Sequence, residues 1–386
     1  MSSTRVIGLI SGTSVDAIDV AVADLWLDRD TVHLVPLGHT EVAYPTDVRQ
    51  EVLAALPPRP ATAEQMCKLD TWIGQAFATA AGTALTEIAP DADLVASLGQ
   101  TVYHWVDGTT CLGTLQLGQP AWIAERTGLP VVSDLRARDV AAGGHGAPLA
   151  GLFDQLWLGD GIALNIGGIA NITSVVDSQA YDTGPGNALL DLAADMVTGK
   201  PYDEDGALAK AGTVRQDLLD VLLADPYYAQ LPPKSTGKEH FNAEYLGEAL
   251  GRVPPVDGPD LLATLVELTA CTIANACVRH DAARVVASGG GVRNPALMAA
   301  LATRLDVDLV TSDSLGIPSD AKEAYLTALL GFLTWHGIPA DPPTGARGPR
   351  LLGSITPGHG PLRLPEPATT NVTKMEVATG GARADT

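Results

Sequence analysis

The sequence predicts an α/β protein built from two domains of related design. A chain of 386 residues is too long for one ordinary hydrophobic core. Short apolar runs that suit strands alternate with longer stretches of helical periodicity. The second half also opens like the first, because a strand, a glycine-containing turn and a second strand begin at Val6 and again at Ile162.

Each element is predicted from its pattern of apolar residues. In the first half, strands are expected at 6–10, 17–25, 33–43, 93–97 and 131–133, and helices at 47–56, 63–88 and 120–127. In the second half, strands are expected at 162–166, 169–175 and 284–288, and helices at 187–198, 214–223, 241–250, 259–279, 294–304 and 320–333. Alternation of this kind favours parallel strands covered by helices.

The expected domains are residues 1–158 and 159–365. The chain becomes rich in proline and glycine from about residue 339, and residues 366–386 show no periodicity. That last stretch is predicted to be a disordered tail.

Composition and charge narrow the classes of function. A hydrophobic share of 46% suits a globular protein, and a formal net charge of −21 disfavours binding to nucleic acid or anionic lipid. The four cysteines form no CxxC pair and are expected to be reduced. Neither a signal peptide nor about 18 consecutive apolar residues is found. A cytoplasmic protein without a membrane partner is therefore expected.

The first polar turn, GTSVDAID at residues 12–19, lies between two expected strands. Glycine lets a ligand approach the backbone, and hydroxyls, amides and carboxylates could hold phosphates and a hydrated cation. An ordinary polar hairpin turn explains the same residues equally well. The candidate ATP-binding residues here are Gly12, Thr13, Ser14, Val15, Asp16, Ala17, Ile18 and Asp19, with Asp16 also the candidate metal ligand.

The turn NIGGIANIT at residues 165–173 repeats this design in the second half. Gly167, Gly168 and Asn171 are candidate ATP-binding residues, and two such turns could clamp the phosphates of one nucleotide. Neither turn matches the GxxxxGK[ST] pattern of a P-loop. A tight hairpin accounts for the two glycines without a ligand, and it is compatible with phosphate contact.

Asp182 opens the segment DTGPGN, in which a carboxylate held at a turn could act as a general base. Taken alone, the segment slightly favours a simple turn-forming role for Asp182. Asn187 is expected to cap the following helix.

The run ASGGGVRNPAL at 287–297 places Gly289, Gly290 and Gly291 after a buried strand. Bare backbone there could border an adenosine ring. The GxGxxG fingerprint of dinucleotide-binding proteins is missing, which favours a nucleoside triphosphate.

Polar groups are also dense around residues 97–105, 133–148 and 320–324. A guanidinium fork suits a carboxylate, and acidic side chains suit sugar hydroxyls. Arg136, Asp139, Glu323 and His104 are the candidate substrate-binding residues. No HExxH or similar spacing supports a zinc site.

Taken in order, these segments resemble the anhydro-N-acetylmuramic acid kinase family. The resemblance runs from Gly8 to about Gly358 and includes NIGGIANIT, DTGPGN, KSTGKEHFN, SGGGVRNP and LLGSITPG. It implies an actin-like fold of two ribonuclease-H-like domains that bind ATP and magnesium. It also implies that the enzyme opens the 1,6-anhydro bond of its sugar with water and phosphorylates the six-oxygen, with Asp182 as the base. A homodimer is the oligomeric state that the resemblance suggests.

Two positions depart from the family pattern. Ala17 stands where the family usually has glycine, and Leu98 stands where it commonly has histidine. Activity is still expected, because Asp182 and both turns are intact.

Two alternatives stay open. A kinase of the same fold could act on another anhydrosugar, such as levoglucosan, which has no lactyl carboxylate to pair with Arg136 or Arg138. A non-catalytic, nucleotide-binding member of the actin-like superfamily is the alternative from another class of function.

Overall fold

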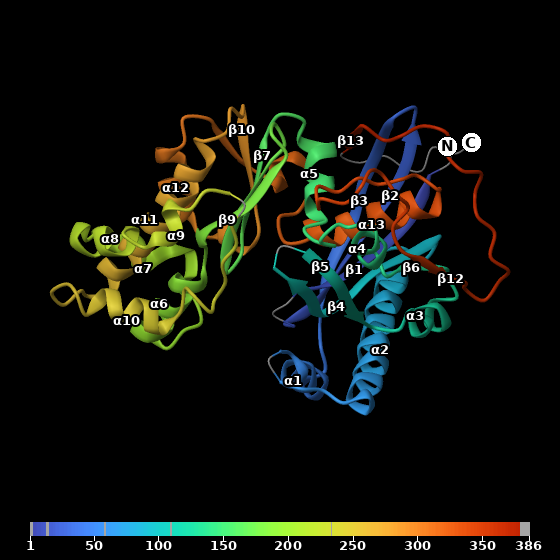
Figure 1. Cartoon of the computed structure of the whole chain (residues 1–386), viewed down its shortest axis with the longest axis horizontal. Coiled ribbons are helices and arrows are strands. Elements are labelled where there is room, and N and C mark those ends of the chain that lie inside the picture. Colours follow the sequence, from blue (N-terminus) through green and yellow to red (C-terminus); the bar gives the residue numbers. More distant parts are fainter. Residues whose placement is uncertain (1–2, 13–14, 58, 109, 233, 379–386) are drawn as a thin grey trace. The chain divides into compact units, whose positions relative to one another are not determined.

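The computed structural model describes residues 3–378 apart from 13–14, 58, 109 and 233. The chain divides into two compact units, each described by itself (Figure 1). Unit 1 comprises Met1–Trp157 and Ala321–Thr386, and unit 2 comprises Leu158–Asp320. The division near residue 158 agrees with the expected one, whereas the expected boundary at 365 does not. Residues 321–365 belong to unit 1 because their helix, α13 (Lys322–Trp335), packs against strands of the first sheet.

Unit 1 is built around an eight-stranded sheet in the order β12-β6-β4-β1-β2-β3-β13, with β5 paired to β4. The strands are β1 Thr4–Ser11, β2 Ala17–Asp28, β3 Thr31–Ala43, β4 Leu94–Asp107, β5 Thr110–Leu117, β6 Val131–Ser133, β12 Ser354–Thr356 and β13 Lys374–Val377. The helices besides α13 are α1 Thr46–Ala55, α2 Ala63–Glu87, α3 Pro120–Thr127, α4 Ala137–Ala141 and α5 Ala150–Leu158.

Side-chain alternation along β1 explains how helices cover both faces of this sheet. Ile7 and Leu9 are fully buried in one core cluster with Phe77 of α2. Gly8, between them, faces α13 so closely that a Cβ there would lie 2.1 Å from the carbonyl oxygen of Ala324. A capping box at Thr62 starts α2.

The expected disordered tail is corrected over its described part. Residues 374–377 form β13, which pairs in parallel with β3 from Lys374 opposite Thr31 to Val377 opposite Leu34. Met375 is 1% exposed. A strand of four residues carries too little periodicity to be recognised in the sequence, and its pairing depends on an edge formed by residues more than 300 positions earlier.

Unit 2 contains a five-stranded sheet in the order β11-β10-β7-β8-β9. Its strands are β7 Ile162–Ile166, β8 Ile169–Ser174, β9 Gln179–Pro185, β10 Arg284–Ser288 and β11 Asp308–Thr311. Its α-helices are α6 Ala188–Thr198, α7 Ala207–Ala211, α8 Gln216–Leu223, α9 Pro226–Ala229, α10 Ala243–Leu250, α11 Gly258–Cys277 and α12 Pro295–Arg304. Short 3₁₀ turns lie at Glu204–Gly206, Gly290–Arg293 and Ser312–Leu315.

The two sheets share one topology. In unit 1 the central order β3-β2-β1-β4-β6 has two antiparallel pairs followed by two parallel pairs. In unit 2 the order β9-β8-β7-β10-β11 repeats that sequence of pairings. Each sheet therefore follows the order 3-2-1-4-5 of a ribonuclease-H-like core. The expected α/β fold of two related domains is confirmed.

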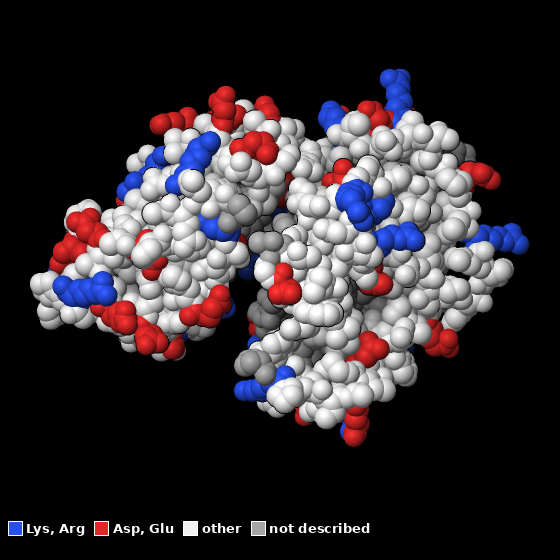
Figure 2. All heavy atoms as spheres, viewed as in Figure 1, with Lys and Arg blue, Asp and Glu red and all other residues white. Residues whose placement is uncertain are grey.

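α11 is the central helix of unit 2 and packs on β8 and β9. By length and composition alone it could cross a membrane, but 83% of the relevant window is buried inside the structure, as in the core helix of a globular protein. On the face visible in Figure 2, acidic side chains are spread over the surface with basic ones among them.

Candidate functional site

The polar turn of unit 1 joins β1 to β2 and is held from two sides. The buried side chain of Gln100 on β4 donates from Nε2 to the carbonyl oxygen of Gly12 at 3.1 Å. Arg49 of α1 donates from Nε to the carbonyl oxygen of Val15 at 2.8 Å and from Nη2 to Asp16 Oδ1 at 2.7 Å. Thr13 and Ser14, predicted to bind ATP, lie outside the described residues.

The backbone of this turn is strained at Val15. Its φ of 55° is a conformation that β-branched residues rarely adopt. The side chain is fully buried, and the Val15 N–H donates to the Gly12 carbonyl at 3.1 Å. Strain of this kind persists only where surrounding packing enforces it, and it gathers at ligand-binding sites. The turn is therefore a better candidate for a ligand site than its polar composition alone indicates.

The remaining residues of the first motif belong to β2. Ile18 is fully buried in the core, so only its backbone could serve a ligand. Ala17 is 8% exposed, lies opposite Ala43, and its carbonyl accepts from Ser11 Oγ at 2.9 Å. Its φ is not positive, so glycine is not required there and the methyl group is accommodated. Asp19 pairs with Ile10 and Glu41 across the sheet.

Asp16 remains the candidate magnesium ligand. Its side chain is 67% exposed at the turn, although one oxygen is paired with Arg49. Among the described residues, no group of three His, Cys, Asp or Glu side chains could hold a metal ion. Magnesium carried on nucleotide phosphates takes only one or two carboxylates from the protein.

The polar turn of unit 2 is the hairpin at Gly167–Gly168, between the end of β7 at Ile166 and the start of β8 at Ile169, as predicted. Its carbonyls accept three backbone hydrogen bonds of 2.8–3.0 Å from Gly186, Asn187 and Ala188, at the start of α6. A Cβ on Gly186 would lie 2.3 Å from the Gly167 carbonyl oxygen. The glycines therefore let the hairpin and the start of α6 meet backbone to backbone.

Asn187 occupies the N-cap position of α6 but makes no side-chain cap bond, contrary to expectation. Its φ and ψ of −84° and −14° are helical, so the side chain is directed away from the first turn. Its Nδ2 instead donates to the Ile166 carbonyl at 3.4 Å.

Asp182 lies within β9, where the side chain is held by the loop that follows α9. Its Oδ2 accepts from Ser235 Oγ at 2.8 Å and from the Thr236 N–H at 3.0 Å. Tyr227 donates its hydroxyl to the Asp182 carbonyl at 2.7 Å. Among the described residues, none donates a hydrogen bond to Oδ1. Hydrogen bonds to one oxygen fix the carboxylate and leave the other available to a water molecule.

A row of polar residues leads across the sheet to Asp182. Ser288 on β10 is opposite Asn165 on β7, Asn165 is opposite Asn171 on β8, and Asn171 is opposite Asp182 on β9. Directly opposed residues project on the same face of a sheet. The predicted residues Asn171 and Asp182 are thus neighbours, one strand from the Gly167–Gly168 hairpin.

The three glycines after β10 differ in the space that surrounds them. A Cβ on Gly289 would lie 2.5 Å from Asn165 Oδ1, and one on Gly291 would lie 2.2 Å from Ile166 Cγ2. Close packing on β7 therefore explains both. A Cβ on Gly290 would meet only Asn187 Nδ2, at 3.9 Å. Of the three, Gly290 is the one with open space for a ligand.

All four predicted substrate-binding residues interact electrostatically in unit 1, each through Arg136. Arg136, at the start of α4, donates from Nη1 to the Gly146 carbonyl at 2.6 Å. Burial lowers the pKa of Arg136, and the negative charges of Glu323 and Asp139 oppose that shift. Burial, and then the charge of Arg136, lower the pKa of His104, whose Nδ1 lies 3.0 Å from Thr114 Oγ1. His104 is therefore neutral at pH 7.

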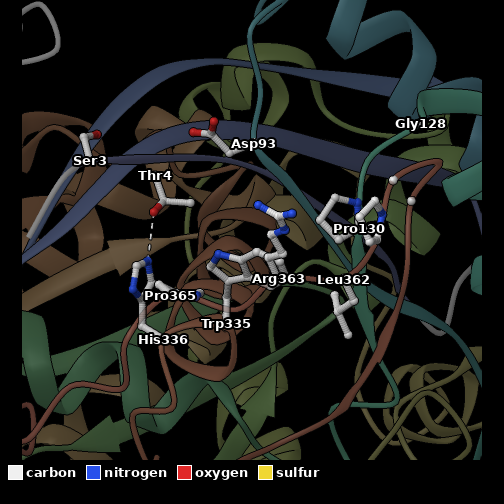
Figure 3. Close-up of a pocket in the computed structure, with 13 residues that line it drawn as sticks. Ser3, Thr4, Asp93, Gly128, Pro130, Trp335, His336, Leu362, Arg363 and Pro365 are labelled. Carbon is white, nitrogen blue, oxygen red and sulfur yellow. Dashed lines mark hydrogen bonds between the residues drawn. The ribbon is translucent and has the colours of Figure 1, made fainter.

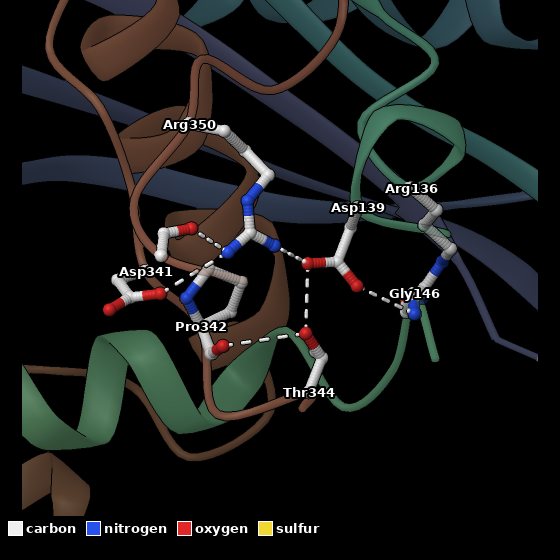
Figure 4. Close-up of polar contacts among 8 residues, drawn as sticks. Arg136, Asp139, Gly146, Asp341, Pro342, Thr344 and Arg350 are labelled. Carbon is white, nitrogen blue, oxygen red and sulfur yellow. Dashed lines mark hydrogen bonds and ion pairs between the residues drawn. The ribbon is translucent and has the colours of Figure 1, made fainter. Parts of the chain in front are cut away.

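Asp139 has a different environment from the one expected (Figure 4). Its side chain is fully buried, Oδ2 accepts from the Gly146 N–H at 2.8 Å, and Oδ1 accepts from Thr344 Oγ1 at 2.8 Å. Arg350 completes the cluster with an ion pair to Oδ1. Both oxygens are engaged, which counts against direct sugar contact. Since Gly146 accepts from Arg136 and donates to Asp139, the cluster positions Arg136.

We expect Leu98→His to lower stability without raising catalytic efficiency. Leu98 is 3% exposed on β4, and an imidazole buried there without a partner costs about 1–3 kcal/mol. Thermal unfolding and kcat/KM measure both effects. Leu98→Met, which conserves volume, is the matched control, and a large gain in kcat/KM for the histidine variant would contradict the expectation.

Other residues of unit 1 line a cavity of about 490 Å³ (Figure 3). Its wall includes Trp335, His336 and Arg363, and none of the predicted site residues. Burial lowers the pKa of His336 to about 4, so its ring is neutral at pH 7. The cavity shares no residue with either polar turn.

Sequence reasoning missed the residues that position the predicted ones. Ser235 and Thr236 hold Asp182, and Thr344 and Arg350 hold Asp139. Their partners are 53 to 211 positions away in the chain, so spacing carries no signal of the contact. Gln100 could have been found, because a glutamine within a strongly apolar strand must be buried with partners.

The fold and the site define a phosphotransferase of the two-domain α/β kind, with a glycine-containing turn in each unit and a fixed carboxylate. The sequence model of the anhydro-N-acetylmuramic acid kinase family matches residues 4–358. The chain belongs to the anhydro-N-acetylmuramic acid kinase family, and it is a kinase.

Curated relatives agree with this assignment. The anhydro-N-acetylmuramic acid kinase of Streptomyces coelicolor is 56% identical, with 94% of this chain and 96% of the relative aligned. The kinase of the same name from Rhodococcus erythropolis is 52% identical, over 92% of this chain and 94% of the relative. Component A of (R)-2-hydroxyglutaryl-CoA dehydratase from Acidaminococcus fermentans, a solved structure, has a TM-score of 0.42 at 14% identity, over 84% and 96% of the two chains. A likeness that distant supports no functional inference.

Proposed function

We propose that this protein is the ATP-dependent kinase that opens the 1,6-anhydro ring of 1,6-anhydro-N-acetylmuramic acid and phosphorylates the six-oxygen, in peptidoglycan recycling. The observation that carries the proposal is the Asp182 carboxylate, fixed through Oδ2 by Ser235 and Thr236, one strand from the Gly167–Gly168 turn. Membership of the family supports the same reaction.

The chemistry requires a base and a positioned phosphoryl acceptor. Asp182 takes a proton from water as the water oxygen bonds to the anomeric carbon, and the bond from that carbon to the six-oxygen breaks. The six-oxygen then bonds to the γ-phosphorus, the β–γ bridging bond breaks, and ADP leaves. Arg136 supplies the cation for the lactyl carboxylate, and Glu323 an acceptor for sugar hydroxyls.

The residues present fit a nucleotide with magnesium. Magnesium bound with ATP neutralises phosphoryl charge, and Asp16 is the described residue that would hold it. In unit 2, the Gly167–Gly168 hairpin supplies backbone donors for phosphate oxygens. Gly290 borders the adenosine.

The first experiment is a coupled ADP-release assay with 1,6-anhydro-N-acetylmuramic acid and levoglucosan in parallel, with product mass confirmed. ADP release with the muramic sugar alone is the expected result. Release with levoglucosan alone would show that the substrate is the alternative anhydrosugar. Because levoglucosan has no lactyl carboxylate, Arg136→Met would then leave KM for the sugar unchanged. If the protein binds ATP but releases no ADP with either sugar, the result would favour the non-catalytic alternative.

We expect Ser235→Ala to lower kcat about tenfold and to leave KM for ATP unchanged, because the variant loses one of the two hydrogen bonds that orient Asp182. Steady-state kinetics with each substrate varied in turn separates the change in kcat from any change in KM. Ser235→Thr, which restores a hydroxyl, should recover most of the rate. An unchanged kcat in the alanine variant would show that Thr236 alone fixes the base.

We further propose that the enzyme acts in the cytoplasm as a homodimer. Light scattering of the purified protein tests the dimer, and fractionation of cells tests the compartment. A monomer at micromolar concentration would contradict the first proposal.

A further inference from the structure

Lys238 lies directly over the Gly167–Gly168 hairpin, the polar turn of unit 2. A Cβ placed on Gly168 would be 2.7 Å from Lys238 Cε and 3.5 Å from its Nζ. The end of the lysine side chain therefore covers the second glycine of the hairpin. This lysine belongs to the KSTGKEHFN segment, which none of the predicted roles includes.

The ammonium group of Lys238 has capacity to bind a ligand. The residue is exposed, and among the described residues it donates no hydrogen bond and makes no ion pair. It acts electrostatically on Asp191, in the first turn of α6. The Asp191 side chain is exposed as a whole, but the protein around its carboxyl group excludes part of the water and raises its pKa to about 6. The positive charge of Lys238 opposes that rise.

The loop that carries Lys238 also holds the proposed base. Ser235 and Thr236, three and two residues before Lys238, donate to Asp182 Oδ2. The hairpin backbone and α6 are joined by the three hydrogen bonds to Gly167 and Gly168. One loop thus fixes the Asp182 carboxylate of β9 and carries a cation over the hairpin, where an anion bound at the turn would meet the ammonium.

We propose that Lys238 is a phosphate-binding residue, whose ammonium contacts the phosphate chain of a nucleotide bound at the Gly167–Gly168 turn. The inference rests on the proposed function for the identity of the nucleotide. It assigns Lys238 the role of a point charge, which suits a phosphate group whose position shifts during transfer. In a protein of net charge −21, one cation at this turn offsets the repulsion of a polyanionic ligand.

The test measures binding and turnover separately in Lys238→Met. We expect affinity for ATP, measured by calorimetry, to fall about 10- to 100-fold, the size of a lost charge-assisted contact, with adenosine affinity unchanged. Lys238→Arg should retain most of the ATP affinity. Lys200→Met is the matched control, because Lys200 is an exposed lysine just beyond the other end of α6, about 16 Å along the helix.

Asp191→Asn gives a second test of opposite sign. Removing the negative charge beside Lys238 should raise ATP affinity at pH 7.5, by roughly fivefold. Lower ATP affinity in this variant would contradict the inference.

Equal ATP affinity and kcat in Lys238→Met and wild type would overturn the inference and leave the proposed function standing. If the wild type releases no ADP with either sugar, the proposed function fails, and the ATP titrations still decide the role of Lys238. Equal weakening of ATP and adenosine binding would also overturn it, since adenosine carries no phosphate.

Discussion

Replacing Asp182 with asparagine should reduce sugar-dependent ADP release by roughly 100- to 10,000-fold, the usual contribution of a positioned general base. Asparagine has the same shape and can still accept from Ser235 and Thr236, so the loop should stay in place. It cannot take a proton from water. Nucleotide binding and thermal stability should therefore change little.

The measurement is kcat with saturating sugar and ATP, together with calorimetric ATP binding. Asp195→Asn is the matched control, because it removes an exposed carboxylate from α6 of the same unit. Wild-type turnover in Asp182→Asn would show that another group activates the water. Loss of ATP binding in this variant would mean that Asp182 serves the nucleotide instead.

Replacing Arg350 with methionine should destabilise unit 1 by about 3 kcal/mol, since breaking a buried ion pair leaves an unpaired charge. The Arg350 side chain is 9% exposed, and that of Asp139 is fully buried. Asp139 keeps its hydrogen bonds from Gly146 and Thr344, which places the loss at the low end of the usual range. KM for the sugar should rise as well, because Gly146 accepts from Arg136.

Differential scanning calorimetry and steady-state kinetics measure the two effects. Arg347→Met is the matched control, because Arg347 is exposed on the same loop and, among the residues that the structure describes, bonds only through its backbone N–H, to Ala142. An unchanged melting temperature would show that Asp139 is satisfied without Arg350. A higher KM for ATP with an unchanged KM for the sugar would contradict the positioning of Arg136.

Local sequence signals predicted the long elements well. The apolar periodicity of residues 63–88 indicated α2, and Pro120 indicated the start of α3. The hairpin at Gly167–Gly168 was found because two glycines between apolar strands leave few other structures. Strands β5 and β9 were missed. The short strands β11, β12 and β13 were missed as well, since three or four residues show too little alternation to be recognised.

The candidate site was only partly predictable. The segments containing Gly12, Asp182 and Arg136 stand out because polar groups and glycines interrupt apolar patterns. The environment of Asp139 could not be predicted, because its partner Arg350 is 211 positions away. The same holds for Lys238, whose position over Gly168 depends on how an irregular loop folds back on the hairpin.

By itself, the sequence determined the α/β class, the repeated strand-turn-strand design and the segments that carry polar chemistry. These follow from periodicity, glycine and capping, which act between residues close together in the chain. Only the tertiary structure decided that the chain returns to unit 1 after residue 320, that Asp139 is a buried anchor, and that Ser235 and Thr236 fix Asp182. Those outcomes depend on packing and hydrogen bonds between distant segments, which no local pattern records.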